Sequence, residues 1–210
     1  MDISTANKHP AVTQAGFTLY ELMITLVIAG VVLSFGMSNL SDFTKNGRMT
    51  ATANDLHAAF FLARSESSRG KTNITICASA TPMAADADCD GTWDQGYIVF
   101  VDSILPSVSR DLVNEPILRR HGALETGVTL AVANNATYFG FASSGLGRGN
   151  INGVPAVTQI VMCDERGNII AAGGNSAARL FVATPLGRAT ILRDMDQIES
   201  VLTDNGLTCP

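Results

Sequence analysis

The sequence is short of the residues that most catalytic and metal sites require. Only His57 and His121 lie beyond residue 16, and neither has a recognisable nucleophile or acidic partner nearby in the sequence. The four cysteines form no Cys-x-x-Cys pair, although zinc sites usually take two ligands from one such turn. The formal net charge of −5 disfavours general attraction to nucleic acid. These absences argue against an enzyme, a zinc domain and a general nucleic-acid binder.

Two segments contain part of a binding motif but lack the residues that complete it. The segment from Ser143 to Gly153 is glycine-rich, but it has no Gly-Lys-Ser/Thr and no following helix with a downstream acid. We expect a flexible surface loop there. The acidic loop from Asp86 to Asp90 lacks the glycine and the closing glutamate of an EF-hand. We expect a solvated loop pinned by Cys89, and no metal or cofactor in either segment.

A single carboxylate, Glu21, interrupts an apolar run near the amino terminus. The run from Phe17 to Phe35 has about the length that a helix needs to cross a bilayer core. An ionised side chain in hydrocarbon costs several kcal/mol and is seldom incidental. The run follows directly on a polar leader, residues 1–16, which ends at Gly16. The sequence therefore predicts a membrane helix that contains a functional acid.

The order of the leader and the apolar run distinguishes a secretory signal peptide from a segment that is cut before its apolar helix. A secretory signal peptide has its small-residue cleavage site after the apolar stretch. Here Ala15 and Gly16 come before that stretch, so cleavage after Gly16 would keep the helix in the mature protein. An uncleaved signal anchor, with Glu21 near the cytoplasmic headgroups, is the alternative on helix physics alone.

The junction Gly16-Phe17-Thr18-Leu19-Tyr20-Glu21-Leu22 resembles the processing site of type IV prepilins and type II secretion pseudopilins. The resemblance implies that a prepilin peptidase cuts after Gly16 and that Phe17 becomes the N-methylated first residue. Glu21 is then the acid at position five of the mature chain. A carboxylate at membrane depth needs a partner, and the α-amine of Phe17 on a neighbouring subunit supplies one. This pairing would set the register of helices that enter a filament, so Glu21 is an assembly group and not a catalyst.

The helix is expected to continue well beyond the apolar run. After Asn39 the apolar residues recur at intervals of three and four, which predicts one long helix from about Phe17 to Arg69. Leu56 and Phe60 would face the globular domain. Gly70 is the candidate for a left-handed cap.

The remaining sequence alternates short β-rich runs with turn residues and predicts antiparallel strands. The predicted strands are Asn73–Ala78, Gly96–Asp102, Pro116–Arg120, Val128–Ala133, Thr137–Ala142, Val157–Cys163, Arg179–Ala183 and Arg188–Arg193. None is followed by a helical pattern, so we expect an α+β, type IV pilin-like fold with a long N-terminal helix packed on a β-rich head. The expected divisions are leader 1–16, transmembrane and assembly helix 17–36, periplasmic helix 37–70 and head 71–210.

The head narrows the resemblance to one branch of that class. Thr75-Ile76-Cys77, the segment from Trp93 to Asp102, Phe139 to Gly145, and Met162 to Gly167 are similar to the GspH/FimT branch, as is the closing Leu207-Thr208-Cys209-Pro210. That branch comprises the minor pseudopilin H of type II secretion and the FimT/FimU minor pilins of type IV pili. The similarity spans nearly the whole chain.

The four cysteines, Cys77, Cys89, Cys163 and Cys209, are expected to form disulfides if the head is exported. Three connectivities are open. Proximity in the sequence favours Cys77 with Cys89, which leaves Cys163 to reach Cys209 and to tie down the C-terminal tail.

A DNA-uptake role has one specific sequence argument. Some FimT relatives capture DNA with a Gly-Arg-x-Arg element, whereas this chain has Gly187-Arg188-Ala189-Thr190 and therefore lacks the second arginine. Arg193 would point to the opposite face of the strand from Arg188. Four acids, Asp194, Asp196, Glu199 and Asp204, follow and would cancel the positive charge that phosphate binding needs. We expect Arg188 and Arg193 to be solubilising charges on an edge strand.

The sequence thus predicts a minor pilin or pseudopilin of the GspH/FimT type. Its expected partners are other pilin-like subunits, the prepilin peptidase and the inner membrane, with the head in the periplasm before the subunit enters a pilus or pseudopilus. No cofactor is expected. The alternatives are a DNA-binding minor pilin for natural transformation and a static single-pass anchored domain. The sequence leaves open whether the filament belongs to type II secretion or to a type IV pilus.

Overall fold

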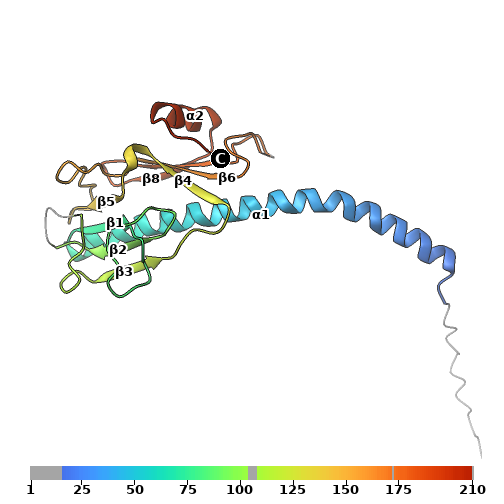
Figure 1. Cartoon of the computed structure of the whole chain (residues 1–210), viewed down its shortest axis with the longest axis horizontal. Helices are drawn as coiled ribbons and strands as arrows, with labels where there is room; N and C mark the ends of the chain where they lie inside the picture. The colour runs from blue at the N-terminus through green and yellow to red at the C-terminus, as the bar shows by residue number, and fades with distance from the viewer. Residues whose placement is uncertain (1–15, 104–107, 172, 210) are drawn as a thin grey trace, which may run out of the picture. The chain divides into compact units, whose positions relative to one another are not determined.

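Helices and antiparallel strands follow one another in the order shown in Figure 1. The computed structural model describes residues 16–103, 108–171 and 173–209. In chain order the elements are α1 (Leu19–Gly70), β1 (Ile74–Ala78), β2 (Tyr97–Val101), β3 (Ile117–His121), β4 (Val128–Val132), the 3-10 turn η1 (Ala133–Asn135), β5 (Tyr138–Phe141), β6 (Gln159–Asp164), β7 (Arg179–Ala183), β8 (Ala189–Leu192) and α2 (Met195–Asp204). One compact unit ends at Phe43 and a second begins at Thr44, so α1 contributes to both.

The strands form two four-stranded sheets in the second unit. Their orders are β3-β2-β1-β5 and β4-β6-β7-β8, and every strand pairing is antiparallel. All eight predicted strands are present. The largest shift at a strand start is at β6, which begins at Gln159 instead of Val157. The predicted long helix is also confirmed, because α1 runs from Leu19 to Gly70.

The core of the second unit forms where α1 packs on the inner faces of both sheets. Leu56 and Phe60 are buried there, as the apolar spacing predicted. The Phe60 ring lies 4.6 Å from the ring of Phe181 in one sheet and 5.0 Å from that of Phe139 in the other. Phe60 therefore joins the two sheets through the helix.

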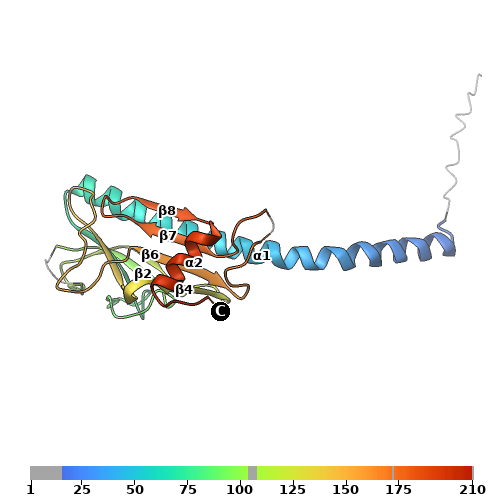
Figure 2. The same ribbon diagram turned by 90° about the horizontal axis from the view of Figure 1, so that it is seen from above.

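A second helix, α2, covers the opposite face of the sheet β4-β6-β7-β8 (Figure 2), and the sequence analysis did not predict it. Ile198, Val201 and Leu202 are buried against this face. Asp194 caps the helix, because its Oδ1 accepts the Gln197 N–H at 2.9 Å. The expectation that no helix follows the strands was wrong, because the acidic segment also has an aspartate N-cap and apolar residues at helical spacing.

The end of α1 also differs from the prediction. Gly70 is still helical, and Lys71 takes the left-handed conformation with φ of 49°. The cap is therefore one residue later than the glycine that was expected to provide it. Helix ends are the part of an element that sequence patterns define least well.

Two disulfides link Cys77 to Cys89 and Cys163 to Cys209. This is the connectivity that sequence proximity favoured. The first closes the loop between β1 and β2, and the second holds the C-terminal tail beyond α2 to strand β6. The tail is therefore fixed at its own end as well as through α2.

Candidate processing and assembly site

The start of α1 is organised by reciprocal hydrogen bonds between Thr18 and Glu21. The Thr18 N–H and the Thr18 hydroxyl each donate to Glu21 Oε2 at 2.9 Å. In return, the Glu21 N–H donates to the Thr18 hydroxyl oxygen at 3.2 Å. Since helix α1 begins at Leu19, this is a capping box with Thr18 as the N-cap and Glu21 as the third helical residue. The acid that interrupts the apolar run thus has a partner within its own chain.

The residues at the expected cleavage point have no packing role in the single chain. A methyl group added at Gly16 would meet nothing within 4 Å. The Phe17 side chain is 84% exposed. Neither a glycine at 16 nor a phenylalanine at 17 is therefore required for the fold of the described residues.

The first part of α1 exposes its apolar side chains on all sides. The exposed residues include Leu19, Leu22, Met23, Ile24, Leu26, Val27, Ile28, Val31, Val32 and Leu33. An apolar helix surface without a partner in its own chain is typical of a helix that lipid or other helices cover. By a hydropathy criterion, however, none of the helices in the described residues is long and apolar enough to cross a membrane.

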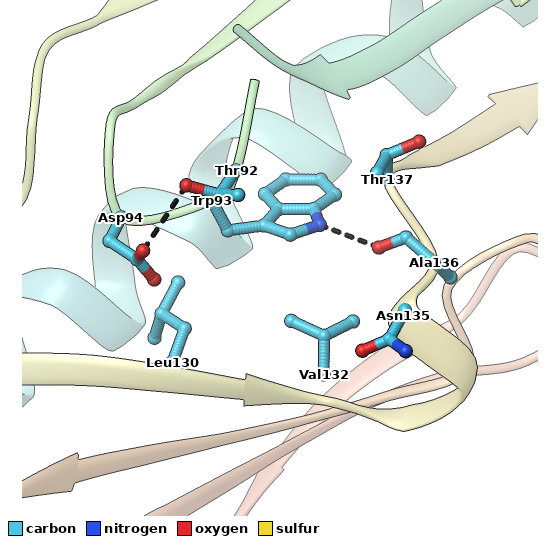
Figure 3. Close-up of a pocket in the computed structure, with 8 residues that line it drawn as sticks. All are labelled: Thr92, Trp93, Asp94, Leu130, Val132, Asn135, Ala136 and Thr137. Carbon is cyan, nitrogen blue, oxygen red and sulfur yellow. Dashed lines mark hydrogen bonds between the residues drawn. The ribbon is translucent and has the colours of Figure 1, made fainter. Parts of the chain in front are cut away.

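The second unit contains a small pocket between the loop before β2, strand β4 and the segment from η1 to β5 (Figure 3). The indole of Trp93 forms one wall, and its Nε1–H donates to the Ala136 carbonyl at 2.8 Å. Leu130 and Val132 of β4 form the apolar side opposite. The volume of about 190 Å³ is below the roughly 300–1,000 Å³ of most small-molecule sites. Within residues 16–103, 108–171 and 173–209, no group of three or more His, Cys, Asp or Glu side chains could hold a metal ion.

A buried ion pair lies beneath the glycine-rich segment that was expected to be a flexible loop. Arg148 Nη2 donates to Asp102 Oδ2 and, at 2.6 Å, to the hydroxyl of Thr75. The Thr75 hydroxyl in turn donates to Asp102 Oδ2 at 2.6 Å. The side chains of Arg148 and Asp102 are only 8% and 1% exposed. The segment is therefore tied to β1 and β2 by its one basic residue, which the sequence analysis did not identify as structural.

The two arginines considered for DNA binding have different environments. Arg188 is exposed, but Arg193 is partly buried. The Nη2 of Arg193 donates to the Ser176 carbonyl at 3.4 Å, and its Nε is buried without a partner. Burial, together with the nearby charges of Arg193 and Arg166, lowers the pKa of Arg179 to about 10. Arg193 is therefore not the solubilising edge charge that we expected.

Together, these features define a class of protein. A capped Gly-Phe-Thr-x-x-Glu junction opens a long helix, and the helix leads into a disulfide-linked head of two antiparallel sheets. This is the arrangement of a type IV pilin-like subunit.

Comparison with known protein families agrees with this class. Residues 13–37 match the prokaryotic N-terminal methylation motif. Residues 52–187 match the family described as "Type II transport protein GspH", which covers more than half of the chain. The chain belongs to the GspH family. It is a pseudopilin or minor pilin, a structural subunit of a type II secretion system or of a type IV pilus, and it assembles with other pilin-like subunits.

Among solved structures, the chain is similar to two crystal forms of the type IV minor pilin FimU of Pseudomonas aeruginosa strain PAO1. The first is 19% identical, with 73% of this chain and 94% of that chain covered and a TM-score of 0.46. The second is 18% identical, with 68% and 90% covered and a TM-score of 0.43. No curated protein matches this chain significantly.

Proposed function

We propose that the chain is made as a precursor, is cut after Gly16 and N-methylated at Phe17, and then enters a filament by its apolar helix. Before assembly, residues 17–36 are held in the inner membrane, residues 37–70 continue the helix into the periplasm, and the head, residues 71–210, lies there. The two disulfides suit that oxidising compartment. The subunit catalyses no reaction and uses no cofactor.

The processing step rests on the methylation motif, and the free space around Gly16 is consistent with it. Because a larger side chain at this position meets nothing within 4 Å, the fold gives no reason for glycine. A peptidase that must bring the chain backbone close to its catalytic groups does give one. The match of residues 13–37 to the methylation motif supports the same site.

The assembly step rests on an exchange of partners at Glu21. In the single chain Glu21 Oε2 accepts two hydrogen bonds from Thr18. Cleavage creates a charged α-amine at Phe17, and a neighbouring subunit can present that amine to the carboxylate. A charged donor gives a stronger hydrogen bond than the neutral Thr18 donors, so the intermolecular pair favours the filament.

Two substitutions at the same capping box test the assembly step. Glu21→Ala removes the carboxylate but keeps the N-cap bond from the N–H of residue 21 to the Thr18 hydroxyl, whereas Thr18→Ala removes the capping hydroxyl and leaves the acid with the N–H of residue 18. We expect processed Glu21→Ala subunits to be absent from isolated filaments and Thr18→Ala subunits to be present. Normal incorporation of Glu21→Ala would show that the acid is not needed for assembly, and an equal loss of both variants would show that it acts only through the capping box.

Mass spectrometry of the amino terminus tests the processing step. The expected product of the wild-type chain begins with N-methylated Phe17, and Gly16→Leu leaves the precursor uncut. Gly30→Leu is the matched control, because a side chain at Gly30 also meets nothing within 4 Å. A Gly16→Leu chain that is cut normally would indicate a static anchored domain or another route of maturation.

A further inference from the structure

A short turn on the head holds two large aliphatic side chains out in solvent. The turn from Asp111 to Glu115, termed the apolar turn, exposes Leu112 by 55% and Val113 by 88%. Its backbone is fixed, because the Glu115 N–H donates to the Asp111 carbonyl at 3.0 Å. Asp111 also accepts the Val113 N–H at 2.8 Å and the Asn114 side-chain amide at 2.9 Å. Leu112 and Val113 are therefore exposed by a hydrogen-bonded turn and not by an irregular loop.

Arg110 anchors the apolar turn to the loop between β1 and β2. The residue is only 8% exposed. Its Nε and Nη2 donate to the carbonyls of Ala87 and Ala85 at 2.8 and 3.3 Å, and its Nη1 donates to the Glu115 carbonyl at 2.9 Å. The Ala85 and Ala87 loop is itself closed by the disulfide between Cys77 and Cys89. A buried guanidinium and a disulfide thus set the position of the turn before any partner binds.

The surface beside the apolar turn is acidic. Asp86 lies between the two alanines whose carbonyls bind Arg110, and Asp86 and Asp90 are exposed. None of the ion pairs formed within the described part of the chain involves Asp86, Asp88, Asp90 or Asp111. The neighbouring arginines, Arg110 and Arg120, donate instead to backbone carbonyls of this loop. The turn is therefore an apolar tip next to carboxylates that form no ion pair among the described residues, although the charge of Arg110 acts on Asp111.

We propose that the apolar turn is a docking point for a different pilin-like subunit, whose complementary surface is an apolar socket flanked by basic side chains. The proposal rests on the proposed function. Pre-organised apolar side chains bind with little loss of conformational entropy, and desolvated aliphatic contacts near a charged rim are typical of specific interfaces. The Trp93 pocket of a second copy is flanked by Asp94, whereas another pocket of this chain combines Arg166 with Ile169 and Leu202, so the crosslinking experiment below decides between a different subunit and a second copy.

Variants of the full chain, assembled in its host, test this docking point. Leu112→Ser/Val113→Ser removes the apolar tip, and Ile169→Ser/Ile170→Ser is the matched control because both isoleucines are at least half exposed elsewhere on the head. We expect the first variant to be processed and to melt like the wild type but to enter filaments about tenfold less. We expect the control to enter normally. Normal entry of the Leu112→Ser/Val113→Ser variant would overturn the proposal.

The identity of the partner is tested by a photocrosslinking residue at Val113 in assembled filaments. The expected product contains a second protein with an N-terminal methylation motif, and Asp86→Lys reduces its yield severalfold. Crosslinking to lipid, to another copy of this chain or to no protein would refute the proposed partner, and an unchanged yield with Asp86→Lys would refute the basic flank. The Glu21→Ala variant distinguishes failure of the proposed function from failure of the docking point. If Glu21→Ala subunits enter filaments normally, the proposed function fails, independently of the result for the apolar turn.

Discussion

The buried ion pair between Arg148 and Asp102 gives the sharpest stability prediction for the head. Arg148→Met removes the cation and leaves the Asp102 carboxylate, 1% exposed, with the Thr75 hydroxyl as its remaining described partner. Removal of one member of a buried pair typically costs about 3–5 kcal/mol, because the other charge stays buried without compensation. The variant should therefore lose a large part of the stability of the head.

The same pair is incompletely hydrogen-bonded, which predicts the effect of removing both charges. Asp102 Oδ1 and Arg148 Nε and Nη1 are buried without a partner. Their desolvation offsets much of the attraction between the two charges, so the neutral double variant Arg148→Met/Asp102→Asn should regain most of the stability that Arg148→Met loses. The double variant is then more stable than the single variant, although it has one more substitution.

Urea and thermal denaturation of residues 44–210, each followed by the fluorescence of Trp93, measure both effects, since Trp93 is the single tryptophan and is buried. For a head of this size about 1 kcal/mol shifts Tm by about 2–4 °C, so Arg148→Met should lower Tm by roughly 6–20 °C. A loss of about 1 kcal/mol or less, the value of a surface salt bridge, would refute the reasoning. A double variant no more stable than the single one would also refute it.

Three further predictions concern the C-terminal helix, its disulfide and the apolar turn. Cys163→Ser/Cys209→Ser opens a link across 46 residues and should cost about 4 kcal/mol by loop entropy; reduction of the wild type should cost more, because it also opens Cys77–Cys89, and unchanged denaturation of the variant would contradict this. Asp194→Ala removes the cap of α2 and should cost about 1 kcal/mol in the same assay, and Asp194→Asn should restore most of it. Hydrogen bonds from the Asn114 side chain and the Val113 N–H lower the pKa of Asp111, so the ionised carboxylate stabilises the folded state. This stabilisation is complete above about pH 3.9, the pKa of an unfolded aspartate, and is lost as the pH falls through the lower folded pKa. An NMR titration should show a midpoint below the ordinary aspartate value, and Asn114→Ala should raise it; a midpoint at the ordinary value would be contrary evidence.

The long helix and the eight strands were predictable because each has a regular apolar pattern of its own. Leu56 and Phe60 recur at the helical interval, and both are in the core. The strands are bounded by glycine and other turn residues, and the segments between two such turns are too short for a helix, so a strand was the expected structure. Strong local periodicity therefore accounts for the correct part of the fold.

What the sequence analysis missed depends on contacts between distant residues or on short local motifs. Arg148 pairs with Asp102, 46 residues away in sequence, and no local pattern indicates that partner. Helix α2 has only ten residues, so its apolar stripe of Ile198, Val201 and Leu202 is a weak helix signal. The aspartate before it, Asp194, is a recognisable N-cap and could have predicted the start of the helix. The capping box of Thr18 and Glu21 is a short local motif, Thr-x-x-Glu, and the expected pairing of Glu21 with another subunit does not include it.

The capping box has a consequence for how a pool of free subunits behaves. A glutamate that already accepts hydrogen bonds from Thr18 does not require an immediate intermolecular partner in order to stay in an apolar environment. Assembly then exchanges one set of hydrogen bonds for another, so Glu21 contributes to it only the difference in strength between the charged pair and the bonds from Thr18.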